Sequence, residues 1–179
     1  CPSSYHTIQT ISNQLTASGF TELSESEDWT LSAGNKYFVT RNLSSVIAFK
    51  IPEELPSGFM LSASHSESPC FKIKPGFTLG GGSYVRLNTE RYGGMIYSSW
   101  LDRPLSVAGR ITVDTDNGIK TQLINIDRDL VVIPNVAIHL SGKSGGGYEL
   151  KPAKDLFPLY GSGGTKTDLA DVISAEAGI

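Results

Sequence analysis

Hydrophobic side chains near the start of the chain recur with the period of an α-helix. Three of them would share one helical face, at Ile8, Ile11 and Leu15. Ser3 or Ser4 can cap this helix, because a serine side chain accepts a hydrogen bond from a free backbone N–H of the first turn. Gly19 is well placed to end it. The pattern therefore predicts an amphipathic helix between these serines and this glycine.

Beyond this helix, a polar segment from Glu22 to Asp28 is followed by short runs of hydrophobic residues. These runs are rich in Val, Ile, Phe and Tyr, which favour strands, and they cover Lys36 to Arg41, Ser45 to Lys50 and Phe59 to Ser64. A helix followed by several strands within about 65 residues indicates the first part of an α/β layered structure.

The pattern changes after His65, where one predicted strand follows another as far as about Leu140. The expected strands are Cys70 to Lys74, Tyr84 to Thr89, Arg110 to Thr115, Thr121 to Ile126 and Asp129 to Ile133. Asn117-Gly118 gives the clearest hairpin signal, since this pair favours a tight turn between strands. We expect loops at residues 79–83, 141–147 and 152–164, and a short helix from Thr167 to Ala175. This region predicts a small β-rich domain.

Length and composition limit the classes of protein to consider. The chain has 179 residues, 39% of them hydrophobic, which suits one domain or two small ones. No apolar run approaches the ~18 residues of a membrane-spanning helix, so we expect no membrane segment. The formal charge, 15 minus 18 or −3, gives no support to nucleic-acid binding or to a polybasic membrane surface.

Cysteine usage and the start of the chain bear on the cellular compartment. Cys1 and Cys70 make no disulfide framework, which favours an intracellular, cytoplasmic protein. The first residues lack the basic start and apolar stretch of a secretory signal. The chain also begins without methionine, which indicates a missing start. A single Asn42-Leu43-Ser44 sequon is weak evidence for secretion, since such triplets are frequent by chance.

Short motifs with a known chemistry are scarce. The chain contains no Cys-x-x-Cys or His-Glu-x-x-His metal spacing and no Gly-x-Ser-x-Gly elbow. The stretch from Gly161 to Thr167 is superficially similar to a phosphate-binding loop. However, it lacks the glycine directly before Lys166, and no clear apolar strand leads into it. We therefore interpret it as a flexible loop.

Of the three histidines, His65 has the most informative surroundings. It follows the predicted strand from Phe59 to Ser64, and α/β sheets bind ligands at the carboxyl ends of their strands. Glu67, two residues further on, could orient the imidazole through its other ring nitrogen. His6, near a helix start, is best interpreted as a surface or packing residue. On the residues alone, the same reading stays open for His65.

The segment around His65 resembles a family motif. Residues His65 to Lys74, HSESPCFKIK, are similar to the Gly-x-His-x-Asp-Ser-Pro-x-x-Lys segment of the aspartyl aminopeptidase and vacuolar aminopeptidase I family of dizinc metallopeptidases, with Ala63 in place of the glycine. Further similarities to that family occur in order along the chain, at Pro2 to His6, Lys36 to Asn42, Glu90 to Arg110 and Ile133 to Leu140. Together they cover nearly the whole chain.

The resemblance implies an α/β fold in two parts. Residues 1–70 would be the first segment of a zinc-peptidase α/β catalytic domain, and residues 71–179 an inserted β-rich dimerisation domain. The implied activity is that of a metalloaminopeptidase that removes amino-terminal residues from peptides by a water activated by two zinc ions. Acidic residues are one candidate preference, which the sequence does not decide. A homodimer or larger homo-oligomer is expected on the same grounds.

The resemblance also assigns roles to individual residues. His65 matches the family's first zinc-ligand histidine. Glu67 stands where the family usually has the aspartate that orients the ligands, and its extra methylene could move the carboxylate by about an ångström. His139 matches a histidine that reaches the active site of the partner subunit and helps to hold substrate. Asn135 replaces a second histidine often found in that segment, and Cys70 is interpreted as a bystander thiol.

Most of the family's metal ligands have no counterpart in this chain. The bridging aspartate, the Glu-Glu pair with its general base, the later acidic ligand and the final histidine all follow the inserted domain in the family. Asp127 and Asp129 fall within that domain and are interpreted as structural or interface residues. We therefore expect this chain to be an incomplete amino-terminal portion, inactive and weak in zinc binding when isolated. The alternative is a non-catalytic self-association module of a truncated relative.

Overall fold

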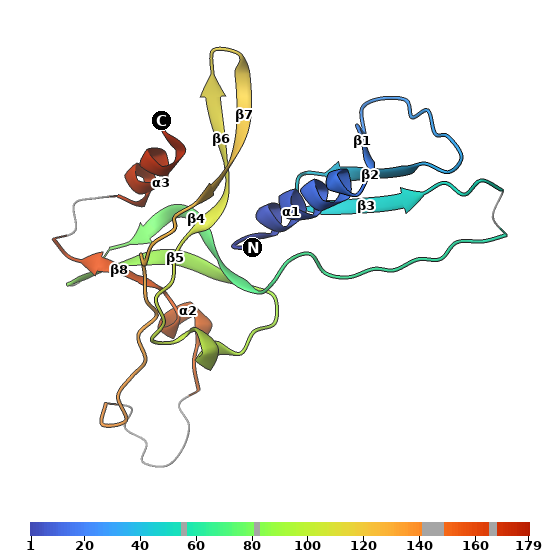
Figure 1. The fold of residues 1–179 in the computed structure, drawn as a ribbon. Helices are drawn as coiled ribbons and strands as arrows, with labels where there is room; N and C mark the ends of the chain where they lie inside the picture. Colours follow the sequence, from blue (N-terminus) through green and yellow to red (C-terminus); the bar gives the residue numbers. More distant parts are fainter. Residues whose placement is uncertain (55–56, 81–82, 141–148, 165–167) are drawn as a thin grey trace. The chain divides into compact units, whose positions relative to one another are not determined.

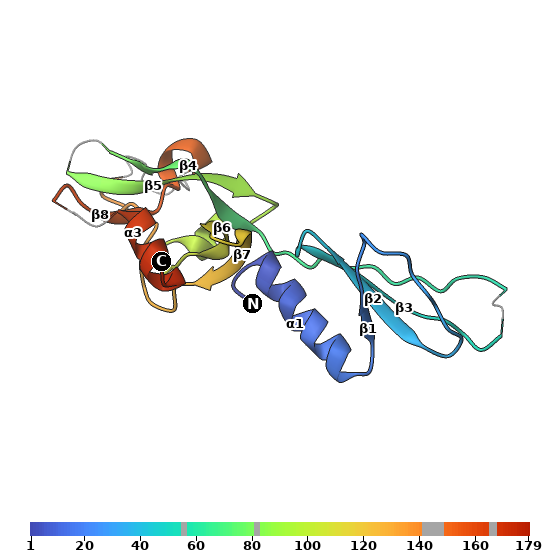
Figure 2. The ribbon, with the colours of Figure 1, turned by 90° about the horizontal axis from the view of Figure 1, so that it is seen from above.

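The computed structural model describes residues 1–54, 57–80, 83–140, 149–164 and 168–179. They form two compact units (Figures 1 and 2). The first unit comprises Cys1–Ser68 and Gly109–Leu123, and the second comprises Pro69–Ala108 and Ile124–Ile179. Within the described residues, helices combine with three small sheets, so the expected α/β class is confirmed. The domain boundary at residue 70 stays a prediction.

Helix α1 (Ser4–Ala17) opens the first unit and agrees with the sequence prediction. Ser3 is its N-cap, and the Ser3 hydroxyl accepts a hydrogen bond from the backbone N–H of His6. Gly19 lies just beyond the helix with a φ of +80°, a left-handed conformation that glycine adopts without steric cost. Ile8 is buried on the apolar face, which packs against the sheet of this unit (Figure 2).

That sheet has three strands, β1 (Thr21–Leu23), β2 (Lys36–Arg41) and β3 (Ser45–Lys50), in this order. β1 runs parallel to β2, and β3 runs antiparallel to it. The central strand β2 buries three consecutive side chains, Tyr37, Phe38 and Val39. β2 and β3 have the predicted bounds. β1 was not predicted, because its short sequence is mostly polar and because the strand that it pairs with, β2, begins only at Lys36.

The strand predicted from Phe59 to Ser64 is wrong. Residues 59–64 belong to no helix or strand, and the side chains of Phe59, Met60 and Leu61 are exposed. Their composition favours a strand, but a strand also needs a neighbour for its backbone hydrogen bonds. No described strand pairs with this segment.

Strands β6 (Ala108–Thr115) and β7 (Gly118–Asn125) form a hairpin, as predicted. The turn is made by Asp116 and Asn117, and Gly118 follows it with a φ of +95°. The Thr115 hydroxyl donates a hydrogen bond of 2.6 Å to the carbonyl oxygen of Gly118, across the turn.

The second unit contains an antiparallel sheet of β4 (Cys70–Leu79), β5 (Tyr84–Tyr92) and β8 (Leu159–Ser162), with β5 in the centre. Its buried core cluster consists of Leu87, Val131 and Leu169. Leu169 begins helix α3 (Leu169–Ala177), whose first turn is capped by the side chains of Asp168 and Asp171. Two shorter elements also belong to this unit, the 3₁₀ helix η1 (Tyr97–Trp100) and helix α2 (Pro152–Asp155).

Several expectations for the second unit need correction. The predicted loop over residues 152–164 contains α2 and β8, because β8 finds a partner in β5, which the local sequence does not reveal. Residues 131–133 make isolated bridges instead of a continuous strand. The predicted final helix is confirmed, two residues later than expected at its carboxyl end. The glycine-rich stretch at 141–147 and part of the loop at 79–83 lie outside the described residues. None of the helices in the described ranges is long and apolar enough to cross a membrane.

Candidate functional site

The structure brings His65 and Glu67 into contact. The Nδ1 atom of His65 lies 3.3 Å from Oε1 of Glu67, within reach of a hydrogen bond. The imidazole is 89% exposed, whereas the glutamate side chain is 33% exposed. The hydrogen bond from His65 is the largest influence on Glu67 and holds the pKa of its carboxyl below the ordinary value. The carboxylate is thus placed to orient the ring.

This contact lies in a segment that is neither helix nor strand. Ser66, between the two residues, donates a hydrogen bond from its hydroxyl to the carbonyl oxygen of Ser44, over 3.3 Å. Ser44 belongs to the turn between β2 and β3. The two serines are 22 residues apart, and no local sequence pattern links them.

The donor set around His65 fits one zinc ligand, but it does not make a complete site. A neutral imidazole whose Nδ1–H is held by a carboxylate presents its Nε2 lone pair to a metal, which is the usual arrangement of zinc-bound histidine. A zinc site needs at least three protein ligands. Across the part of the chain that the structure describes, no group of three or more His, Cys, Asp or Glu residues could hold a metal ion.

His139 lies in the second unit, in an exposed turn at residues 138–140. Asp102 holds the residues that lead into this turn by two hydrogen bonds of 2.9 Å. Its backbone N–H donates to the carbonyl oxygen of Ile133, and its carboxylate accepts from the backbone N–H of Asn135. Three apolar side chains around His139 are exposed to 46%, 66% and 80%, in the order Val136, Ile138 and Leu140. The role expected for His139 stays a prediction.

Cys1 and Cys70 are free thiols on exposed residues, and partial burial of the Cys70 sulfur, which disfavours the thiolate, raises the pKa of its thiol. Asp127 and Asp129 are exposed in the second unit. Of the glycine-rich stretch from Gly161 to Thr167, the first two residues belong to β8 and the last three lie outside the described residues.

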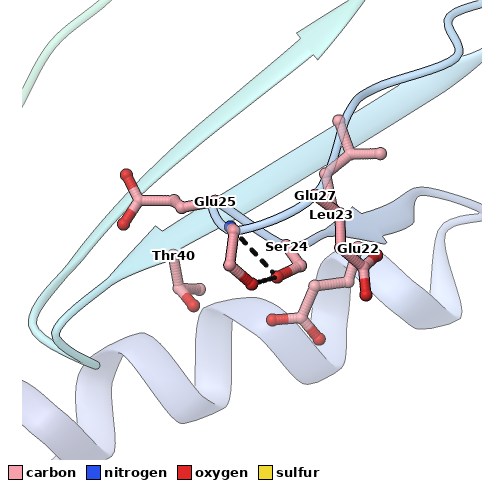
Figure 3. A pocket seen from close by; sticks show the side chains of 7 residues that line it. Glu22, Leu23, Ser24, Glu25, Glu27 and Thr40 are labelled. Atoms are coloured by element: carbon pink, nitrogen blue, oxygen red, sulfur yellow. Dashed lines mark hydrogen bonds between the residues drawn. The ribbon is translucent and has the colours of Figure 1, made fainter.

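A shallow pocket in the first unit is lined mostly by polar residues from the end of β1, from the segment that follows it and from β2 (Figure 3). Its lining includes three carboxylates, from Glu22, Glu25 and Glu27, and the hydroxyls of Ser24, Ser26 and Thr40. The guanidinium of Arg41 pairs with Glu25, with Nη2 2.6 Å from Oε1. The carboxylates make this pocket unfavourable for an anion. It contains neither His65 nor Glu67.

Comparison with known proteins adds to this geometry. The family model described as aminopeptidase I zinc metalloprotease (M18) matches residues 1–171. A relative from Clostridium acetobutylicum, named probable M18 family aminopeptidase 2, is 40% identical over 186 residues, which cover 99% of this chain and 43% of the relative. The chain therefore spans less than half the length of that relative.

Solved structures resemble the chain over almost its whole length. A chain in the cryo-EM structure of the Ape4 and Nbr1 complex matches with a TM-score of 0.86 and 34% identity, over 98% of this chain and 37% of that one. The mApe1 structure from Chaetomium thermophilum matches with a TM-score of 0.84 and 26% identity, over 99% of this chain and 44% of that one. The two small units thus have the fold of the corresponding part of these larger chains.

Proposed function

The chain belongs to the aminopeptidase I zinc metalloprotease family (M18), and on this premise we propose that it supplies His65 as a zinc ligand of a metalloaminopeptidase. The enzyme would remove amino-terminal residues from peptides. The single observation that carries the proposal is the contact between His65 and Glu67. The imidazole is exposed, and the Glu67 carboxylate lies within hydrogen-bonding distance of its Nδ1. A carboxylate in this position is the usual partner of a zinc-bound histidine.

Each residue has a distinct part in the proposed chemistry. Zinc, when bound, lowers the pKa of a bound water and polarises the scissile carbonyl, and the family resemblance favours two ions. Glu67 would accept a hydrogen bond from the Nδ1–H of His65, which leaves the Nε2 lone pair available to a metal ion. His139 would donate an N–H to the developing oxyanion of a substrate bound by a partner subunit. Acidic residues remain the candidate substrate preference.

Isolated, the 179-residue chain should bind zinc weakly and catalyse nothing. The reason is the ligand count, since the described residues offer no group of three ligands. The chain would then act within a larger protein that carries the remaining ligands, as the length of the relatives suggests.

The test uses zinc titration of the isolated chain followed by the imidazole NMR signals of its three histidines. We expect the His65 signals to respond first and saturably, and His65→Ala to abolish that response. His6→Ala is the matched control, since His6 bonds to the cap of α1 and has no role in the proposal. A His65 signal that ignores zinc would refute the ligand assignment. Turnover of Asp-, Glu- or Leu-anilides, with zinc retained through dialysis, would refute the expected inactivity.

The role of His139 needs the longer protein. There, His139→Ala should lower kcat while the mass of the oligomer and its zinc content stay unchanged. Loss of the oligomer would instead show a structural residue.

A second function, self-association without catalysis, is favoured by the exposed apolar residues around His139. In that case Ile138→Ser should lower the mass of the isolated chain in sedimentation, whereas zinc should have no effect on it. An unchanged mass after this substitution would exclude the segment as the association surface.

A further inference from the structure

We propose that Arg110 is a positioning residue for the His65–Glu67 pair, and that it acts through the turn between β2 and β3. This inference rests on the role proposed above for His65. All the residues involved belong to the first unit, although Arg110 lies on β6, far from the pair in sequence.

Arg110 holds the turn by two hydrogen bonds from one nitrogen. Its Nη1 donates to the backbone carbonyl oxygen of Asn42 over 2.7 Å and to the side-chain Oδ1 of Asn42 over 2.8 Å. The guanidinium carbon also lies 4.5 Å from the centre of the Tyr5 ring, on helix α1. Because a cation is attracted to the face of an aromatic ring, this contact holds the guanidinium in place in addition to its bonds to Asn42. Arg110 therefore connects the hairpin, the helix and the turn.

The turn itself has a conformation that needs support. Asn42 and Leu43 both have positive φ, at 52° and 54°. Asparagine tolerates this region, but leucine adopts it only at a steric cost, and such strain persists where neighbouring contacts enforce it. The bonds from Arg110 to Asn42 are contacts of that kind. A hydrogen bond of 3.1 Å from the N–H of Ser44 to the carbonyl oxygen of Arg41 closes the turn.

The turn between β2 and β3 contacts the segment that carries His65 and Glu67. The carbonyl oxygen of Ser44 accepts the hydroxyl of Ser66, which lies between His65 and Glu67. Residues 59–69 belong to no helix or strand, and β4 begins only at Cys70, so strand pairing does not place His65. The path from Arg110 to the pair is thus Asn42, then Ser44, then Ser66. At 3.3 Å its last bond is long for a hydroxyl donor, so we expect a moderate effect.

A purely structural role for Arg110 would affect folding but not the state of the His65 ring. The critical readout is therefore the tautomer of neutral His65 in the metal-free chain, measured from the ¹⁵N shifts of both ring nitrogens at alkaline pH. A ring held by Glu67 keeps its proton on Nδ1, because the hydrogen bond of one nitrogen sets the tautomer.

The variants interrupt the path at two points. Arg110→Met removes the donors, Arg110→Lys keeps the charge but not the guanidinium group, and Ser66→Ala removes the final bond. Lys120→Met is the matched control, because it removes a positive charge from an exposed position on the same hairpin. Amide spectra of β2 and β3 verify that each variant is folded. If Arg110→Met does not fold, Ser66→Ala decides by itself, since the exchange removes only one hydroxyl from a half-buried position.

We expect Arg110→Met and Ser66→Ala to lower the Nδ1-protonated fraction of His65, Arg110→Lys to restore part of it, and Lys120→Met to leave it unchanged. Zinc affinity at His65 should fall by about three- to tenfold in the first two variants, less than the 10–100-fold typical of direct partners of a ligand. A wild-type tautomer in folded Ser66→Ala would overturn the proposal. If the tautomer shifts as expected but zinc never affects His65, the positioning role stands and the proposed metal role fails.

Discussion

The apolar residues that precede His65 should make the isolated chain self-associate. Phe59, Met60 and Leu61 are exposed to 90%, 103% and 92%, so almost their whole side chains remain in water. Burying a side chain of this size is worth about 1.5–3 kcal/mol, and Phe59 and Leu61 together therefore offer about 3–6 kcal/mol to an association that covers both. A free energy of 1.4 kcal/mol corresponds to about tenfold in affinity, and a contact buries only part of each side chain. The double variant Phe59→Ser, Leu61→Ser should therefore weaken association by about tenfold to hundredfold.

Sedimentation velocity over a wide range of concentrations, together with binding of a hydrophobic dye, measures this effect. The double variant should stay folded, because exposed side chains away from packed contacts contribute only about 0.5 kcal/mol to stability. Ile119→Ser is the control, since Ile119 is exposed but has no exposed large apolar neighbour beside it in sequence. The reasoning is refuted if the double variant has the same mass distribution as the wild type, or if the wild type is monomeric throughout and binds no dye.

Three further predictions concern stability and charge. Ile8→Ala should lower the free energy of unfolding of the first unit by about 2–5 kcal/mol, because Ile8 is buried between α1 and the sheet; chemical denaturation followed by amide signals measures it. Asp168→Ala should cost the second unit about 0.5–2 kcal/mol through loss of the α3 cap, with a smaller loss for Asp171→Ala. In ¹³C NMR, Glu67 should titrate below its ordinary pKa of 4.5. Its ionised form therefore stabilises the folded chain above that pH, and this contribution is lost as the pH falls through the lowered pKa. His65→Ala should return the pKa of Glu67 toward 4.5, and an unchanged pKa would contradict the hydrogen bond.

Elements whose signals are local were predicted well from the sequence. Helix α1 followed from the spacing of its apolar residues and from Ser3, and β2 and β3 had the predicted bounds. The hairpin of β6 and β7 followed from Asn117-Gly118. In each case the hydrogen bonds close within one element or across a short turn, so the residues that specify them are neighbours in sequence.

The candidate site could be predicted only in part. The spacing of His65 and Glu67 predicted their contact, because only one residue lies between them and a short segment can bring their side chains together. Arg110, Asn42 and Ser44 gave no such signal. Their relevance to the pair depends on hydrogen bonds between segments that are distant in sequence, one of them spanning 68 residues.

By itself, the sequence determined the local elements, the mixed α/β class and the family motif around His65. Only the tertiary structure decided which segments pair. It converted the expected loop at Leu159–Ser162 into a strand beside β5, and it left the strand-like residues 59–64 without a partner. The physical reason is the same in both cases. A strand is stabilised by the backbone of its neighbour, and which neighbour lies within hydrogen-bonding distance depends on how the whole chain folds.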